Sequence, residues 1–293
     1  MVFPLIFEED IAFEIEKYIF LWQIIRLIIM DIVNKYSSET VKNNSSTENQ
    51  SDQNNFDVII LLDLSGSMYT RDFKMEETEL VIETIREQCN STVSENFISK
   101  IKDKDIISRY EGALVGILLY ILRIIERGSD DKVSIIPFSD TAKVIKFGDE
   151  QFISSSDEDI KNRVDELIET AEAFLRSSTD ISTSLAESIE VMKSLDKDKM
   201  KMIVLLTDEN SHDRLPDLNE RLQNILNKRL SPREDIVINT VGLGDKVPDE
   251  LLNSIADKTG GEYSRADCLP ALLKAFSHFS QYTSERASVI FEG

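Results

Sequence analysis

The sequence predicts a doubly wound α/β fold built around a central, mostly parallel sheet. Short, continuous apolar runs recur along the chain, and longer stretches with helical periodicity lie between them. Continuous apolar runs are typical of strands buried on both faces. Strands that alternate with helices favour a parallel sheet covered by helices on both sides. The chain has 293 residues, of which 41% are hydrophobic, so it is long enough to bury such a core.

The predicted strands begin after a distinct amino-terminal region. Buried strands are expected at 57–62, 133–138, 200–206 and 236–241. A weaker strand at 142–147 follows 133–138 after three residues, which predicts a hairpin and one antiparallel strand at an edge of the sheet. A last strand is expected near 261–265. The predicted helices are 109–127, 157–175, 183–195, 214–229, 248–258 and 270–286.

The amino-terminal region divides into two predicted parts. Residues 1–36 contain an amphipathic helix, and residues 37–56 are polar, rich in Asn and Ser, and typical of a flexible linker. The apolar face of the helix includes Trp22, and Arg26 interrupts the uncharged run of residues. A spanning helix needs about 20 mostly apolar residues. We therefore expect no transmembrane span, and a helix that docks on its own domain, on another copy or on a partner.

Charge and composition exclude several classes of function. The chain carries 54 acidic and 33 basic residues, a net charge of −21, which disfavours nucleic acid and anionic lipid as partners. Two cysteines provide no disulfide framework, and we expect a cytoplasmic protein. The two histidines, His212 and His278, match no zinc signature. Any metal site must therefore use oxygen ligands.

Oxygen ligands follow the predicted strands. Asp63, Ser65 and Ser67 come after the strand at 57–62, and Asp208 comes after the strand at 200–206. Thr179 precedes the helix at 183–195. Open α/β sheets place ligand sites beyond the carboxyl ends of their strands, and hydroxyls with carboxylates suit a hard cation such as Mg²⁺. Alternatively, Asp63, Ser65 and Ser67 are turn and capping residues, and Thr179 or Asp180 is only the N-cap of the helix at 183–195. Thr183 is the hydroxyl that competes with Thr179 as a ligand.

The order Asp63-x-Ser65-x-Ser67, Thr179, Asp208 resembles the metal-ion-dependent adhesion site of von Willebrand factor A (VWA) domains. The likeness extends over about residues 57–67 and 108–288. It implies a domain at 57–293 and a bound Mg²⁺, with Mn²⁺ or Ca²⁺ as alternatives. It further implies that Ser65, Ser67 and Thr179 ligate the ion, that Asp63 and Asp208 hold its waters, and that the ion captures an acidic side chain of a protein partner.

The sequence departs from the family pattern at two places. Glu209 stands where the family commonly has Gly, and its side chain is either an exposed loop residue or a group that crowds the open metal position. An insertion at about 69–107 separates the serines from the first long helix. It contains predicted helices at 75–88 and 95–102. An insertion that leaves directly from the metal loop is a candidate for partner contact or for a lid.

These observations lead to three hypotheses of function. The first is a cytoplasmic, metal-dependent protein-interaction module, an adaptor subunit of a larger assembly such as one with an AAA+ ATPase or a stress-response system. The second is a homo-oligomerising structural protein whose metal site only stabilises it. The third, a metal-dependent hydrolase, lacks support because the chain has neither a GxSxG motif nor a P-loop. We therefore expect no enzymatic activity.

Overall fold

A computed structural model describes residues 56–75, 78–89, 91–127, 131–145, 151–154, 160–174, 178–195, 198–209, 215–229 and 235–291. The predicted amino-terminal helix and most of the predicted linker lie outside these residues. Residues 49–293 form one compact unit. Its elements are β1 (Phe56–Asp63), η1 (Gly66–Tyr69), β2 (Arg71–Lys74), α2 (Thr78–Gln88), α3 (Thr92–Ile101), β3 (Ile106–Ser108), α4 (Arg109–Arg127), β4 (Lys132–Phe138), β5 (Ile153–Ser154), α5 (Ile160–Ala173), α6 (Ile181–Lys193), β6 (Met200–Thr207), α7 (Leu215–Arg229), β7 (Ile236–Leu243), α8 (Asp249–Asp257), β8 (Tyr263–Ala266) and α9 (Leu269–Phe291).

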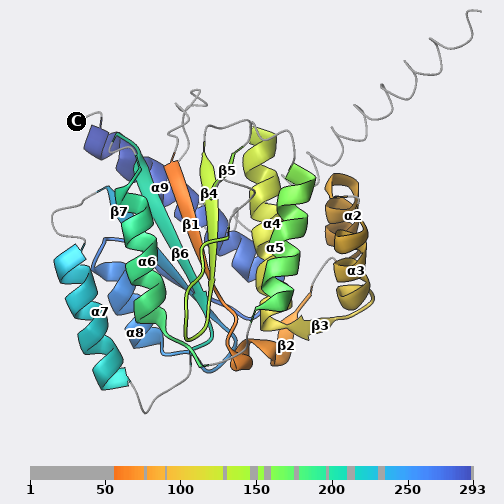
Figure 1. Cartoon of the computed structure of the whole chain (residues 1–293), viewed down its shortest axis with the longest axis horizontal. Helices are drawn as coiled ribbons and strands as arrows, with labels where there is room; N and C mark the ends of the chain where they lie inside the picture. Colours follow the sequence, from red (N-terminus) through yellow and green to blue (C-terminus); the bar gives the residue numbers. More distant parts are fainter. Residues whose placement is uncertain are drawn as a thin grey trace, which may run out of the picture. The chain divides into compact units, whose positions relative to one another are not determined.

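A mostly parallel sheet forms the centre of the unit, as the sequence predicts (Figure 1). Within the described residues it has six strands in the order β5-β4-β1-β6-β7-β8. β1 pairs in parallel with both β4 and β6, so the strand that carries Asp63 occupies the middle of the sheet. β5 is the antiparallel strand at one edge. This order brings the carboxyl ends of β1, β4 and β6 together at one edge of the sheet.

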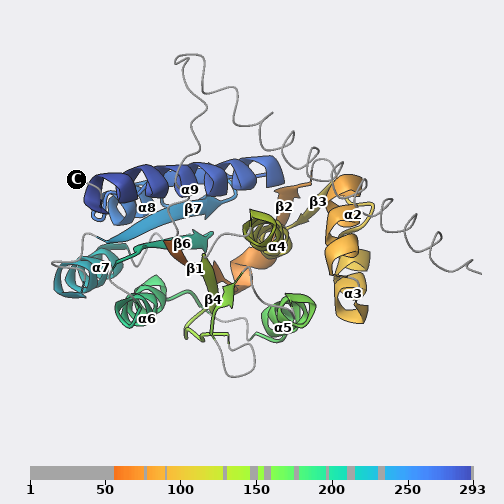
Figure 2. The same ribbon diagram turned by 90° about the horizontal axis from the view of Figure 1, so that it is seen from above.

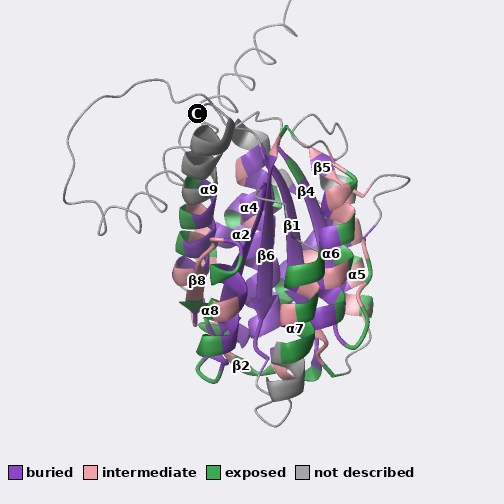
Figure 3. Cartoon of the chain, turned by 90° about the vertical axis from the view of Figure 1, so that its left-hand side faces the viewer, coloured by how far each residue is buried: buried purple, intermediate pink, exposed green. Residues whose placement is uncertain are grey.

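Helices cover both faces of the sheet (Figure 2). Alternate residues of β1 enter different cores: Val58, Ile60 and Leu62 pack with α4, α5 and α9, whereas Ile59 and Leu61 pack with α6, α7 and α8. Figure 3 shows the central strands largely buried, with exposed residues mainly on the outer helices and loops. This two-sided burial explains why the strands appear in the sequence as continuous apolar runs.

The predicted hairpin at 133–138 and 142–147 is only partly correct. Ala142 forms a single antiparallel bridge to Phe138, and the backbone N–H groups of Lys143 and Ile145 donate to β4. The antiparallel edge strand itself is β5, at 153–154. Pro137 provides a physical reason, because it has no N–H to donate back to the neighbouring strand.

The insertion contains more structure than the two predicted helices. Its helices are α2 and α3, and its ends pair as antiparallel strands β2 and β3. The Lys74 N–H donates to the Asp267 carbonyl at 3.0 Å, which attaches β2 to the chain just after β8. The insertion therefore begins and ends beside the carboxyl edge of the main sheet.

No helix of the described residues has both the length and the apolar character that crossing a membrane requires.

Candidate metal centre

The loop after β1 places hydroxyl groups above a buried carboxylate. The Leu64 N–H donates to the Phe138 carbonyl at 2.8 Å, which holds the start of this loop against β4. The Ser65 N–H then donates to Asp63 Oδ1, also at 2.8 Å. Asp63 is fully buried, whereas Gly66 is exposed. A Cβ placed on Gly66 would meet no atom within 4 Å, so the loop is open to an approaching ligand.

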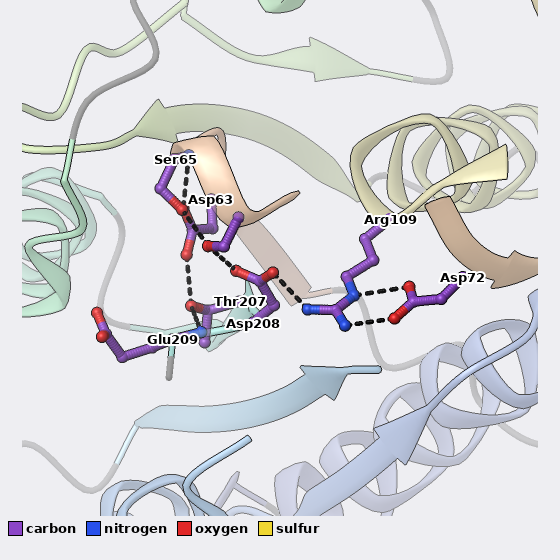
Figure 4. Close-up of polar contacts among 8 residues, drawn as sticks. Asp63, Ser65, Asp72, Arg109, Thr207, Asp208 and Glu209 are labelled. Atoms are coloured by element: carbon purple, nitrogen blue, oxygen red, sulfur yellow. Dashed lines mark hydrogen bonds and ion pairs between the residues drawn. The ribbon is translucent and has the colours of Figure 1, made fainter. Parts of the chain in front are cut away.

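The end of β6 completes a hydrogen-bonded cluster with this loop (Figure 4). Ser67 Oγ donates to Asp208 Oδ1 at 2.7 Å and lies 3.1 Å from Ser65 Oγ. Thr207 Oγ1 donates to Asp63 Oδ2 at 2.5 Å. The structure thus brings together four predicted site residues from two neighbouring strands: Asp63, Ser65, Ser67 and Asp208.

Thr179 lies in a third loop at the same edge. The backbone N–H of Asp180 donates to the carbonyl of Ser139, which follows β4. Asp180 caps α6, and it accepts hydrogen bonds from the Thr183 N–H and from Thr183 Oγ1. Of the two candidate caps, Asp180 is therefore the N-cap of α6. Thr179 is partly exposed, and no hydrogen bond joins it to the cluster within the described residues.

Arg109 belongs to this cluster, and the sequence interpretation missed it. Its Nη1 donates to Asp208 Oδ2 at 2.6 Å, and its Nε donates to Asp72 Oδ1 at 2.8 Å. A second bond joins Nη2 to Asp72 Oδ2. A signal was available in the sequence, because Arg109 opens a predicted helix. A cation is disfavoured at a helix N-terminus unless acidic groups accompany it.

Burial sets the electrostatics of the two site carboxylates. It raises the pKa of Asp63 to about 7, an effect that the Thr207 hydrogen bond partly opposes and the nearby Asp208 carboxylate reinforces. Burial likewise raises the pKa of Asp208, against the hydrogen bonds from Ser67 and Arg109. A positive charge bound beside these carboxyl groups would favour their ionised forms.

Glu209 is buried, so its interpretation as an exposed loop residue is wrong. Its side chain is 4% exposed, and its N–H donates to Thr207 Oγ1 at 3.0 Å. Its charge raises the pKa of Asp208. Figure 4 shows its carboxylate on the side of the cluster away from Arg109.

The donor set fits a hard divalent cation. Within the described ranges, no group of three or more His, Cys, Asp or Glu side chains could hold a metal ion. A cation here would therefore depend on the Ser65 and Ser67 hydroxyls as well as on Asp63 and Asp208. Neutral hydroxyl and carboxylate oxygens are the ligands that Mg²⁺ accepts, together with waters.

The fold and the site together define a class: an α/β domain with a hydroxyl and carboxylate cluster at the carboxyl edge of its parallel sheet. The family model of the von Willebrand factor type A domain matches residues 111–276, more than half of the chain. The chain therefore belongs to the von Willebrand factor A family, whose domains generally mediate protein interactions. The match includes Thr179 and Asp208 and begins after the Asp63–Ser67 loop.

Solved structures are similar to this chain at low sequence identity. One is a variant of the PilB minor pilin from Streptococcus sanguinis, with a TM-score of 0.56 and 17% identity. The match covers 83% of this chain and 65% of that pilin, so this chain spans less than two thirds of its length. Another is the conserved hypothetical protein BatB from Bacteroides thetaiotaomicron, with a TM-score of 0.49, 18% identity, and coverage of 78% and 99%. No curated protein matches the chain.

Proposed function

We propose that this protein is a divalent-cation-dependent protein-interaction module. The observation that supports this proposal is the convergence of two buried carboxylates and two hydroxyls, from β1 and β6, beneath an open loop at Gly66. Mg²⁺ is the proposed ion, with Mn²⁺ or Ca²⁺ as alternatives. Ser65, Ser67 and Thr179 are its proposed ligands, and Asp63 and Asp208 its proposed water-holding carboxylates.

The bound cation would capture an Asp or Glu side chain of a partner protein. Hydroxyl ligands are neutral, so they leave positive charge on the ion for an external carboxylate. The insertion, which borders this edge through β2 and β3, would add contacts that select the partner. The proposed setting is the cytoplasm, in an adaptor subunit of a larger assembly such as one with an AAA+ ATPase or a stress-response system.

We further propose that the protein is not an enzyme. Ser67 Oγ donates to Asp208 Oδ1 and contacts Ser65 Oγ. The other oxygen of Asp208 is paired with Arg109, and this positive charge disfavours Asp208 as a general base that would activate Ser67. A binding role uses the same groups without such activation. Phosphatase and esterase assays with generic substrates are expected to show no turnover, and metal-dependent turnover would favour the hydrolase instead.

The metal site is tested by calorimetry. Mg²⁺ and Mn²⁺ are titrated into the chelator-treated chain and into the double variant Ser65→Ala/Ser67→Ala. The wild type is expected to bind one ion, and the double variant to lose binding because two ligand oxygens are gone. A matched control is Ser99→Ala on α3, whose hydroxyl bonds within its own helix. Equal heats of binding for the wild type and the double variant would contradict the assignment of Ser65 and Ser67 as metal ligands.

A further inference from the structure

Arg109 occupies a position where a cation needs compensation. It is the first residue of α4, at the positive end of the helix dipole. Its side chain is only 7% exposed, so water screens it weakly. A buried guanidinium at such a place is stable only if acidic groups surround it.

Two acids from different parts of the chain supply that compensation. Asp208, which is fully buried, comes from the end of β6 in the main sheet. Asp72 comes from β2 of the insertion, and its two oxygens accept a forked pair of bonds from the guanidinium. Such a planar fork fixes the orientation of the guanidinium. Arg109 therefore joins the insertion to one of the proposed site carboxylates (Figure 4).

The backbone after β7 of the main sheet provides a contact surface for the guanidinium. A Cβ on Gly244, just after β7, would lie 2.6 Å from both Cζ and Nε of Arg109. Gly244 has a φ of 91°, which a residue with a side chain rarely adopts. The guanidinium thus packs directly against the Gly244 backbone, and its place is built by β6, β7, β2 and α4 together.

The consequence for Asp208 is that its two oxygens have different partners. Oδ2 accepts from Arg109, whereas Oδ1 accepts from Ser67. The Asp208 carboxylate therefore lies between the positive charge of Arg109 and the proposed ligand Ser67. Like charges at such close range in a buried environment repel strongly.

We propose that Arg109, oriented by Asp72 of the insertion, is a positioning residue that sets the cation affinity of the Ser65–Ser67–Asp208 cluster. This inference rests on the proposed metal-binding function. Arg109 fixes the orientation of Asp208 and neutralises part of its charge. Asp72 in turn offsets the charge of Arg109. The insertion thereby controls how negative the site is when a cation enters.

This role predicts opposite effects for the two partners of one ion pair. Arg109→Gln removes the repelling charge, so the site should bind Mg²⁺ and Mn²⁺ about tenfold more tightly. Asp72→Asn keeps a side chain of the same shape but leaves Arg109 uncompensated, so binding should weaken several-fold. Arg109→Lys keeps the charge and should bind nearly as the wild type does. A merely structural role would weaken binding in all three variants.

The experiment is calorimetric titration of Mg²⁺ and Mn²⁺ into the full chain, with thermal unfolding measured in parallel. The control is Arg86→Gln, which changes net charge equally at an exposed ion pair with Glu95 on the insertion helices. Its cation affinity should equal that of the wild type. Equal or weaker binding by Arg109→Gln overturns the proposal.

The outcomes separate this inference from the proposed function. If Arg109→Gln does not fold, Asp72→Asn decides, and unchanged or tighter binding by that variant overturns the proposal. If Ser65→Ala/Ser67→Ala abolishes binding while the Arg109 and Asp72 variants match the wild type, the metal site stands and this inference fails. If the wild type binds neither cation, both fail.

Discussion

At the scale of single residues, Asp63 shows how burial and hydrogen bonding oppose each other at the candidate site. It is fully buried, and it accepts hydrogen bonds from the Ser65 N–H and from Thr207 Oγ1. Donors of this kind favour the carboxylate, but burial has the larger effect, and the pKa rises to about 7. A bound divalent cation would reverse that balance, because it stabilises the charged form.

The raised pKa of Asp63 predicts how stability changes with pH. The folded state holds a proton on Asp63 that the unfolded chain, with a pKa of 3.8, has already lost. The contribution to stability is therefore present in acid and declines as pH rises from about 4 to about 7, by about 1.4 kcal/mol per pKa unit. Metal-free protein should show a falling melting temperature over this range, measured by thermal unfolding in chelator.

The control for this effect is Asp63→Asn, which cannot ionise and should flatten the pH dependence. Added Mg²⁺ should stabilise the wild type more at pH 8 than at pH 5, because the cation competes with the proton. A wild-type melting temperature that rises from pH 5 to pH 7 in chelator would contradict the raised pKa.

Individual residues also show what the sequence leaves undetermined. Asp63, Ser65, Ser67 and Asp208 are identifiable because they lie at the end of a buried strand or within a few residues of it. Arg109 lies more than forty residues from the serine loop, across the insertion, and nothing local indicates its partner. Its pairing with Asp208 depends on how α4 docks against the edge of the sheet.

At the scale of elements, the insertion is anchored as part of the domain. Phe73 of β2 is fully buried, and its ring fills the space that a side chain at Gly112 of α4 would occupy. Beside it, Asp72 pairs with Arg109. One short strand therefore provides both an apolar anchor and an electrostatic link to the site.

Replacing Phe73 should measure how strongly the insertion is anchored. Phe73→Ala leaves a cavity against α4 and should lower the free energy of unfolding by about 3–5 kcal/mol. The neighbouring Lys74→Ala removes only an exposed ion pair with Asp267 and should cost less than about 1 kcal/mol. Chemical denaturation of both variants gives the comparison. Equal costs would mean that β2 is not packed as a core strand.

The antiparallel edge strand of the sheet is a feature that the pattern of side chains in the sequence did not locate correctly. The run at 142–147 has the composition of a strand, and it does bond to β4 at Ala142, Lys143 and Ile145. However, the paired edge strand is β5, whose two residues carry almost no pattern of their own. Strand pairing is decided by backbone donors and tertiary position, which side-chain patterns describe incompletely.

At the scale of the whole molecule, the net charge of −21 affects both proposed binding events. A negative field attracts a cation to the site, but it opposes an acidic side chain that approaches afterwards. Partner capture through the ion should therefore depend on the metal and on ionic strength.

The amino-terminal region offers a separate test at this scale. Residues 49–293 form a compact unit of their own. A chain that starts at Asn49 should retain the cation affinity of the full chain. If the predicted helix within residues 1–36 mediates self-association, sedimentation will show a smaller oligomer for the truncated chain. An unchanged oligomer size would assign that helix to docking on its own domain or on a partner.

The sequence by itself determined the α/β class, the parallel core strands and the candidate metal residues. These features follow from local causes: strands buried on two faces must be continuously apolar, and ligand groups follow strand ends. Only the tertiary structure decided that Arg109 neutralises Asp208, that Asp72 of the insertion orients it, and that Glu209 is buried. Those contacts join segments far apart in the chain, and they exist only because packing brings the insertion, α4 and β6 to the same edge of the sheet.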